Sequence, residues 1–132
     1  MSPIHTAAAF ENSLDVASLL IEMGADVNAR DGMGMSPLHA AASWESLDVA
    51  SLLIEKEADI DAKDRDGMSP LHAAASKECF YVAGLLIEKG ADIDAKDRKG
   101  RTPLRAAFLE DSMDVIDLLL ENGADTEDMD FS

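Results

Sequence analysis

The tetrapeptide Ser36-Pro37-Leu38-His39 decides how this chain folds, because it returns at a fixed interval. It recurs 33 residues later as Ser69-Pro70-Leu71-His72 and 33 further on as Thr102-Pro103-Leu104-Arg105, and Ser2-Pro3-Ile4-His5 precedes it by 34 residues. A second phrase is spaced at 33 throughout: Gly24-Ala25-Asp26, Glu57-Ala58-Asp59, Gly90-Ala91-Asp92 and Gly123-Ala124-Asp125. Such a period predicts stacked supersecondary units, so functional surfaces are expected to span several repeats. The one extra residue must lie between Ser2 and Leu14, where it is expected to lengthen the first inter-helix turn.

One repeat, residues 35–62, predicts a pair of short helices. Ser36 suits the N-cap position, and Pro37 suits the first helical position, where its missing N–H group has no partner to lose. A short alanine-rich helix follows, and residues 44–46 turn the chain. From Leu47 the apolar spacing predicts an amphipathic helix of about two and a half turns. A pair this short cannot bury its own apolar face, so neighbouring pairs must stack.

Glu57 departs from this pattern, because the other copies have glycine at its position just after the second helix. That position commonly adopts a left-handed backbone conformation, which glycine takes without penalty. The sequence therefore predicts a strained Glu57.

These four copies resemble ankyrin repeats. The family's helix-opening Thr-Pro-Leu-His motif is matched at positions 2–5, 36–39, 69–72 and 102–105, with serine for threonine in three of them. Its closing Leu-Leu-Gly-Ala-Asp phrase is matched by Leu19-Leu20 through Asp26 and by the three equivalents. The resemblance covers residues 2 to about 127 and implies an all-α solenoid of helix-turn-helix units with β-hairpin-like turns. It implies one domain over 1–132, with repeats at about 2–34, 35–67, 68–100 and 101–130, and binding to other proteins.

Charge and cysteine content narrow the classes of partner and compartment. Twenty-seven acidic against eleven basic residues give a net charge of −16. This disfavours nucleic acid and anionic membrane surfaces, whose binding relies on lysine and arginine. The chain has no apolar run long enough for a membrane span and no signal-peptide pattern at its N-terminus. Cys79 is the single cysteine, which favours a reducing compartment. An intracellular protein, cytoplasmic or nuclear, is expected.

Residues that look chemical have a structural interpretation instead. His5, His39 and His72 share one repeat position and should lie in a row about 10 Å apart, too far to share one zinc ion. In the ankyrin motif this histidine bonds to neighbouring backbone and to the preceding hydroxyl. The aspartates of the Ala-Asp phrases are expected to cap their own turns rather than bind calcium. We therefore expect no catalytic residue, no cofactor and no metal site.

The resemblance places partner binding on a concave groove built from hairpin tips and first helices. We define the groove surface as eight residues: Met33, Met35, Trp44, Met68, Lys77, Arg98, Lys99 and Arg101. Mapping the pattern also picks out Phe10, Leu109 and Glu110. Methionine is an adaptable contact residue and tryptophan offers a large area, so both suit an interface. The alternatives are that Trp44 packs across the seam between repeats, the methionines cover the turns, and the basic tip pairs with Asp94 and Asp97.

The function expected is a non-catalytic protein-binding module, either a monomer or a weak end-to-end dimer. One alternative is an acidic inhibitor that masks the basic surface of an enzyme or a transcription factor. Another is a structural segment of a longer array, in which case Ile4, Ala7 and Ala8 would be exposed on an uncapped first repeat.

Overall fold

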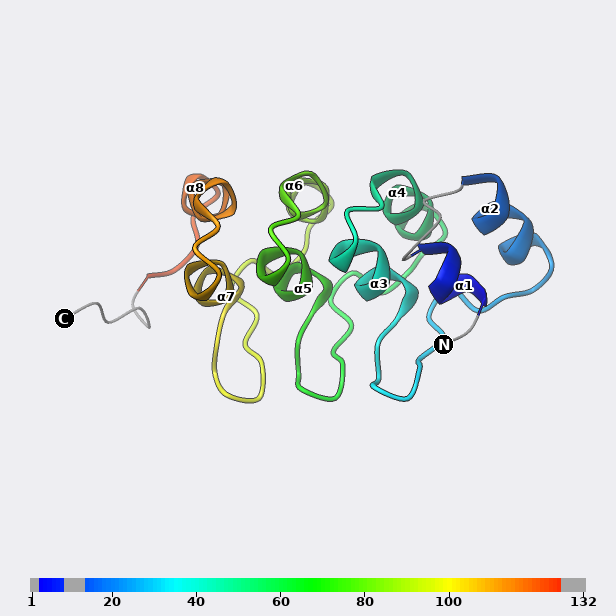
Figure 1. Cartoon of the computed structure of the whole chain (residues 1–132), viewed down its shortest axis with the longest axis horizontal. Coiled ribbons are helices and arrows are strands. Elements are labelled where there is room, and N and C mark those ends of the chain that lie inside the picture. Colours follow the sequence, from blue (N-terminus) through cyan, green and yellow to red (C-terminus); the bar gives the residue numbers. More distant parts are fainter. Residues whose placement is uncertain (1–2, 9–13, 127–132) are drawn as a thin grey trace.

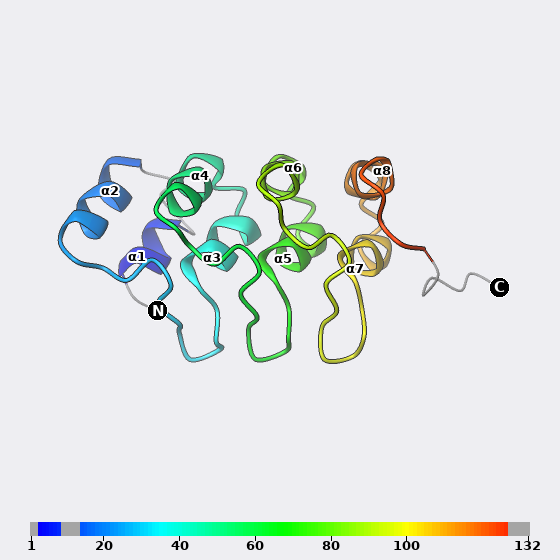
Figure 2. The ribbon, with the colours of Figure 1, turned by 180° about the vertical axis from the view of Figure 1, so that it is seen from behind.

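The computed structural model describes residues 3–8 and 14–126, in which eight α-helices form four consecutive pairs. The first helices of the pairs are α1 (Pro3–Thr6), α3 (Pro37–Ser43), α5 (Pro70–Ser76) and α7 (Pro103–Leu109). The second helices are α2 (Leu14–Glu22), α4 (Leu47–Glu55), α6 (Phe80–Glu88) and α8 (Met113–Glu121). The two sets form two parallel rows, and the loops between pairs project from the row of first helices (Figures 1 and 2). The described residues contain no strand, so the fold is the expected all-α solenoid.

Each complete first helix begins at a hydroxyl cap. The backbone N–H of His39 donates to Ser36 Oγ, and the side chain of His39 in turn accepts from the Ser36 N–H at 3.1 Å. Ser69 and Thr102 cap α5 and α7 at the same position, and proline follows each cap. The cap satisfies N–H groups that a helix start leaves without partners. Ser2, the equivalent in the first repeat, lies outside the described residues.

Stacking of small side chains buries one layer of core per repeat. Leu38, Leu71 and Leu104 are each no more than 1% exposed, and the alanines beside them are also buried. The second helices add Val49, Val82 and Val115 and Leu53, Leu86 and Leu119, also at the same repeat positions. Alanine lets neighbouring helices approach closely, which is why a chain with few aromatic residues still forms a continuous buried core.

Hydrogen bonds from each repeat to the next reinforce this packing. The Nε2 atoms of His5, His39 and His72 lie 2.7 Å from the backbone oxygens of Met35, Met68 and Arg101, each one repeat further on. In a second set of bonds between repeats, the backbone N–H groups of Asp59, Asp92 and Asp125 donate to the side chains of Asn28, Asp61 and Asp94. Asp26, Asp59 and Asp92 accept from the N–H group two residues later, as the sequence predicted. The histidines are therefore structural, as expected from the motif.

Of two expectations about the first repeat, the structure contradicts one, and the other falls outside the described residues. Ile4, Ala7 and Ala8 are at most 2% exposed, so the prediction of an exposed apolar end was wrong. The cause is that α1 packs against both α2 and α3, which leaves these side chains facing inward. The turn expected to hold the extra residue falls mainly on 9–13, outside the described residues.

Glu57, in the second repeat, has a φ of +70°, which confirms the strained conformation predicted for it.

No helix in the described ranges is both long enough and apolar enough to cross a bilayer.

Candidate functional site

The hairpin tips are held rigid by one aspartate each. The Asp64 carboxylate accepts from the backbone N–H groups of Asp66 and Met68, both at 2.9 Å, while its own N–H donates to the Met68 oxygen at 3.0 Å. Asp31 and Asp97 make the same set of bonds in their own tips. Burial alone would raise the pKa of Asp97, but hydrogen bonds from the backbone and side chain of Arg101 outweigh it and lower that pKa. The tips are therefore preorganised and do not need to fold on binding.

Adjacent tips also contact one another directly. The Arg65 N–H donates to the Met33 oxygen at 3.1 Å, and the Arg98 N–H donates to the Asp66 oxygen at 3.0 Å. Gly67 makes room for this approach, because a Cβ atom there would lie 2.8 Å from the Arg98 nitrogen. The tips consequently form a continuous row along one edge of the molecule (Figure 1).

The three methionines of the groove surface are not equivalent. Met33 sits at the first tip and is 59% exposed. Met35 and Met68 are only half-buried side chains at the base of their loops, and their backbone oxygens accept from His5 and His39. Met33 is therefore the most exposed of these three methionines, whereas Met35 and Met68 cover the loop base, as in the alternative interpretation.

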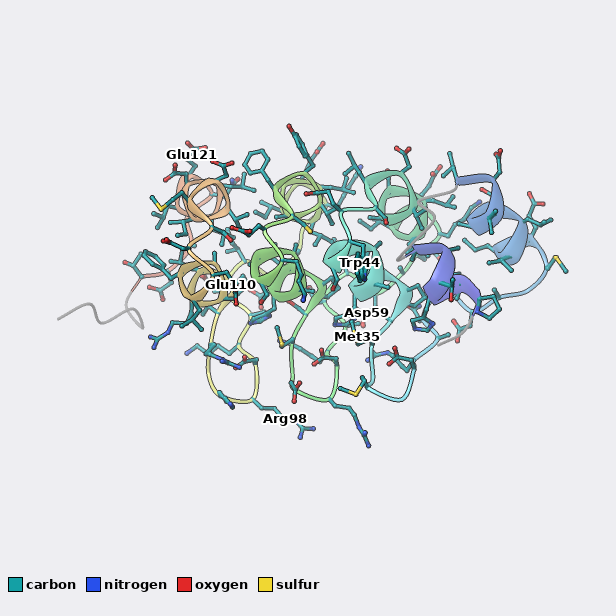
Figure 3. All side chains as sticks on the ribbon, in the orientation of Figure 1. Met35, Trp44, Asp59, Arg98, Glu110 and Glu121 are labelled. Carbon is teal, nitrogen blue, oxygen red and sulfur yellow. The ribbon has the colours of Figure 1, made fainter. Side chains whose placement is uncertain are left out.

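Trp44, Lys77 and Glu110 form a second row at the C-caps of α3, α5 and α7. Trp44 is 59% exposed, so most of its surface is not packed into the seam between repeats. Figure 3 shows Trp44 and Glu110 at the ends of their helices, with Met35 and Arg98 on the loops below. One apolar, one basic and one acidic residue thus occupy the same repeat position, which the fold leaves free to vary.

The basic tip divides into two parts. Arg98 and Lys99 are exposed at the third tip. Arg101 instead pairs with Asp97, with Nε 3.0 Å from Oδ2, so the alternative of pairing within the tip holds for Arg101. Met68 and Arg101 meet in a small cavity of about 100 Å³ that is also lined by Leu109 and Glu110. The structure therefore brings two of the eight groove residues together in one pocket, and distributes the others over the tips, one loop base and the C-caps.

Phe10, which the sequence also assigned to the groove, lies outside the described residues. Sequence reasoning missed Glu45, whose carboxylate accepts from the Val82 N–H at 2.7 Å and so caps α6 of the next repeat. No signal in the sequence pairs two positions that lie 37 residues apart.

The structure gives no support to a reactive thiol at Cys79 or to a metal site in the described residues. Burial raises the pKa of the Cys79 thiol to about 11, so the thiolate is disfavoured at neutral pH. Residues 3–8 and 14–126 contain no group of three or more His, Cys, Asp or Glu side chains arranged to hold a metal ion. What the geometry offers chemically is a rigid surface of varied side chains, suited to contact with another molecule.

Comparison with known proteins agrees with this architecture. A family model described as ankyrin repeats (three copies) matches residues 1–64 and, in a second match, residues 61–130. The two matches together extend over almost the whole chain.

Proposed function

This chain belongs to the ankyrin-repeat family, and from that premise we propose that it is a non-catalytic module that binds a partner protein through the groove surface. Ankyrin repeats are generally protein-protein interaction modules. Proteins of the family are typically non-catalytic. Beyond this general property, the partner of this chain contacts the hairpin tips and the C-caps of the first helices.

The exposure of Met33 and Trp44 is the observation that carries this proposal. Both side chains are 59% exposed, although burying them would be favourable. Met33 projects from a tip that the hydrogen bonds to Asp31 fix in place, and Trp44 lies at the end of α3, just before a turn closed by the Ser46 N–H bond to the Ala41 oxygen at 2.9 Å. Large side chains on a rigid support make good anchors, because little conformational entropy is lost on binding. A stable complex on this surface is expected to bury about 1,200–2,000 Å² in total.

Neighbouring repeats supply substitutions that test the groove with little risk to the fold. Asp66 occupies the position of Met33, and Lys77 occupies that of Trp44. We expect the double variant Met33→Asp, Trp44→Lys to fold as the wild type does and to lose its partner. The measurement is affinity capture from a cell lysate with quantitative mass spectrometry, using both chains as bait.

Tyr81→Asp serves as the matched control, since it places an acidic residue on the opposite row of helices, where Asp48 already stands in the preceding repeat. It should retain the groove partner. Retention of every wild-type partner by the groove variant would contradict the proposal.

The net charge of −16 favours a second candidate, an acidic inhibitor that covers a basic surface of an enzyme or a transcription factor. Electrostatic attraction of this kind is screened by salt, with a Debye length of about 8 Å at physiological ionic strength. Partners that both chains capture at low salt, and that are released as salt is raised, would support this candidate over the groove. Because a lone cysteine avoids disulfide chemistry, we place either function inside the cell, in cytoplasm or nucleus.

A further inference from the structure

The second helices α2, α4, α6 and α8 form the outer row, and one of them departs from the repeat pattern in a way that the groove does not explain. Helices α2 and α4 have the same sequence, LDVASLLIE, whereas α6 reads FYVAGLLIE. Repeats 35–67 and 68–100 differ at these pairs only: Trp44/Lys77, Ser46/Cys79, Leu47/Phe80, Asp48/Tyr81, Ser51/Gly84, Glu57/Gly90 and Asp66/Lys99. Most of the differences therefore gather within residues 79–84, at the start of α6.

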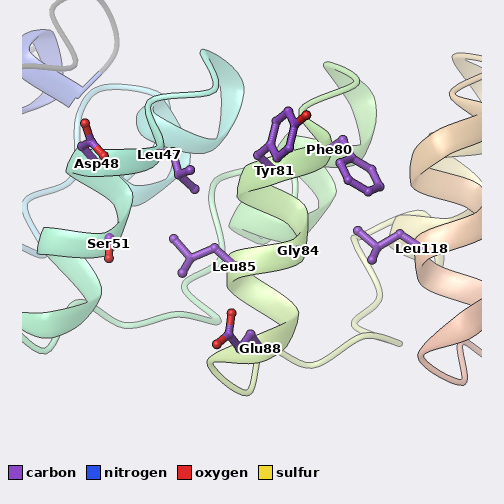
Figure 4. A pocket seen from close by; sticks show the side chains of 9 residues that line it. All are labelled: Leu47, Asp48, Ser51, Phe80, Tyr81, Gly84, Leu85, Glu88 and Leu118. Carbon is purple, nitrogen blue, oxygen red and sulfur yellow. The ribbon is translucent and has the colours of Figure 1, made fainter.

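Three of these substituted residues line one cavity. Phe80, Tyr81 and Gly84 face an open cavity of about 510 Å³ that extends from α4 across α6 to α8. Figure 4 shows Leu85 directed toward α4, Phe80 directed toward Leu118 of α8, and Gly84 on the turn of α6 between them. The volume falls within the range of roughly 300–1,000 Å³ that is usual for ligand pockets.

The aromatic pair is exposed at the rim of this cavity. Tyr81 is 66% exposed and Phe80 is 37% exposed. Their rings meet edge to face, with centroids 5.4 Å apart and planes inclined at 85°. Neither ring is required for stacking, because α2 and α4 occupy the same place in their repeats with leucine and aspartate.

Gly84 lowers the stability of helix α6, which contains it. A glycine inside a helix destabilises it by roughly 0.5–1 kcal/mol relative to alanine. A Cβ atom at Gly84 would lie 3.9 Å from the nearest atom, Leu118 Cδ2, so no steric demand of the fold requires glycine there. A glycine without a structural reason, beside two exposed aromatic rings, indicates a surface adapted for contact.

The charge around the cavity selects the kind of occupant. The four outer helices, within their bounds, contain eight acidic residues and no basic one: Asp15, Glu22, Asp48, Glu55, Glu88, Asp114, Asp117 and Glu121. Asp48 and Glu88 belong to the cavity lining itself. A second copy of this chain, also at −16, is repelled from such a surface, and so is nucleic acid.

We propose that the outer cavity is a second binding site, which accepts a basic amphipathic segment of a partner protein. One apolar side chain of that segment occupies the space beside Tyr81 and Gly84, and its lysine or arginine residues lie over Asp48 and Glu88. An amphipathic helix lying in an apolar groove is a common mode of peptide recognition. Tyr81 also offers an aromatic face to a cationic side chain.

The test uses three synthetic peptides with one helical pattern. The first has leucine at positions i, i+3, i+4 and i+7 and lysine at the positions between them, the second replaces lysine by glutamate, and the third replaces leucine by serine. Binding is measured by isothermal titration calorimetry at physiological ionic strength. The wild-type chain is expected to bind the lysine–leucine peptide at least about tenfold more tightly than either of the others, the effect of one well-placed anchor.

The matched variant Phe80→Leu, Tyr81→Asp, Gly84→Ser gives α6 the sequence that α2 and α4 already have. It should fold, and its thermal unfolding checks this. It adds one negative charge, so attraction by charge alone predicts that it binds the lysine–leucine peptide as tightly as wild type or more so. The proposal predicts the opposite, a loss of about tenfold or more in affinity.

Unchanged or tighter binding by this variant would overturn the proposal and identify the interaction as general electrostatic attraction. Equal binding of the glutamate–leucine peptide by the wild-type chain would also overturn it, because the occupant would then not be basic. The groove variant Met33→Asp, Trp44→Lys should retain the peptide, which keeps this test independent of the function proposed for the groove. Loss of peptide binding in the groove variant alone would place the peptide on the groove and likewise overturn the outer site.

Discussion

At the scale of single residues, four residues other than glycine within 3–8 and 14–126 adopt a positive φ: Glu45, Glu57, Glu78 and Asp111. At Glu45 a hydrogen bond offsets the backbone strain, because its carboxylate caps α6 of the next repeat. Glu57 has a φ of +70° where Gly24 and Gly90 have +95° at the equivalent positions. Its conformation is set by the helix end, and within the described part of the chain no hydrogen bond or ion pair of its side chain offsets the strain.

Glu57→Gly is therefore expected to stabilise the protein by about 1 kcal/mol, the cost of a left-handed conformation for an L-residue. Urea unfolding measures it as a raised midpoint with an unchanged slope. The reverse substitution, Gly90→Glu, should lower stability by a similar amount, and no atom within 4 Å of a Cβ there would add a clash. An unchanged or lowered midpoint for Glu57→Gly would contradict this explanation.

The buried histidines make stability depend on pH. Burial lowers the pKa of His39 and His72 below 6.5, although the hydrogen bonds to the Met68 and Arg101 oxygens act in the opposite direction. Both are neutral in the folded chain, because Nδ1 accepts from the Ser36 or Ser69 N–H while Nε2–H donates to the carbonyl. The unfolded chain binds protons at a higher pH than the folded chain does. Stability is thus complete above about pH 6.5 and falls as the pH decreases toward the folded pKa.

The free energy of unfolding should accordingly decrease by up to about 1.4 kcal/mol per pH unit for each histidine below pH 6.5. Urea unfolding in buffers from about pH 8 to pH 5 measures this slope. His39→Gln removes one titrating group, so its slope should be about half that of the wild type. The lowered pKa of Asp97 affects stability only below about pH 3.8, outside this window. A stability that stays constant between pH 7 and pH 5 would refute the assignment of neutral buried histidines.

At the scale of helices, the two sets begin in different ways. The first helices α3, α5 and α7 begin at side-chain caps, and proline follows each cap. The second helices α4, α6 and α8 begin at Ser46, Cys79 and Ser112, none of which makes a side-chain cap bond. The hydroxyl of Ser112 is buried and has no hydrogen-bond partner in the part of the chain that the structure describes. The second helices are therefore stabilised chiefly by burying their apolar faces.

Two serine-to-alanine substitutions distinguish the capped first helices from the second helices, which begin without a side-chain cap bond at their N-cap residue. Ser69→Ala removes the acceptor for the His72 N–H and the contact with Nδ1, and should destabilise the protein by about 1 kcal/mol. Ser112→Ala removes a buried hydroxyl that makes no bond, so stability should change by less than about 0.5 kcal/mol or increase. Chemical denaturation of both variants tests the pair. Equal losses at both positions would mean that hydroxyl capping does not distinguish the two sets of helices.

At the scale of the whole molecule, stability comes from contacts between neighbouring repeats. Helices contact their counterparts one repeat away, as α3 does with α5 and α5 with α7. The histidine bonds, the tip-to-tip bonds and the Asn28, Asp61 and Asp94 bonds all run from one repeat to the next. A solenoid of this kind behaves as a sum of repeat stabilities and nearest-neighbour interfaces.

Two glycines with the same backbone conformation isolate one such interface. Gly67 and Gly100 both have a φ of +78°, so replacing either by alanine introduces the same strain of about 1 kcal/mol. At Gly67 the new Cβ would also lie 2.8 Å from the backbone nitrogen of Arg98, whereas at Gly100 no described atom lies within 4 Å. Gly67→Ala should therefore cost about 1–3 kcal/mol more than Gly100→Ala. Thermal unfolding of the two variants measures the difference, and equal losses would show that the tips do not support one another.

The sequence by itself determined the repeat period, the helix starts and the strained Glu57, and its resemblance to the ankyrin motif implied the role of the histidines. These features follow from interactions within a few residues of the chain, or from a period that applies the same geometry to each copy. The tertiary structure decided which side chains are accessible. It buried Ile4, Ala7 and Ala8, paired Arg101 with Asp97, exposed Met33 more than Met35 and Met68, and joined Glu45 to Val82.

The outer cavity shows why these outcomes are not contained in the local sequence. Its walls come from α4, α6 and α8, so its shape depends on how far apart three repeats stack and on what a glycine leaves open between them. The groove surface remains a prediction for the same reason, since its eight residues are distributed over four repeats and their fit depends on the shape of the partner. Local sequence specifies the conformation of each repeat, while distances between repeats are set by packing, and a binding surface depends on those distances.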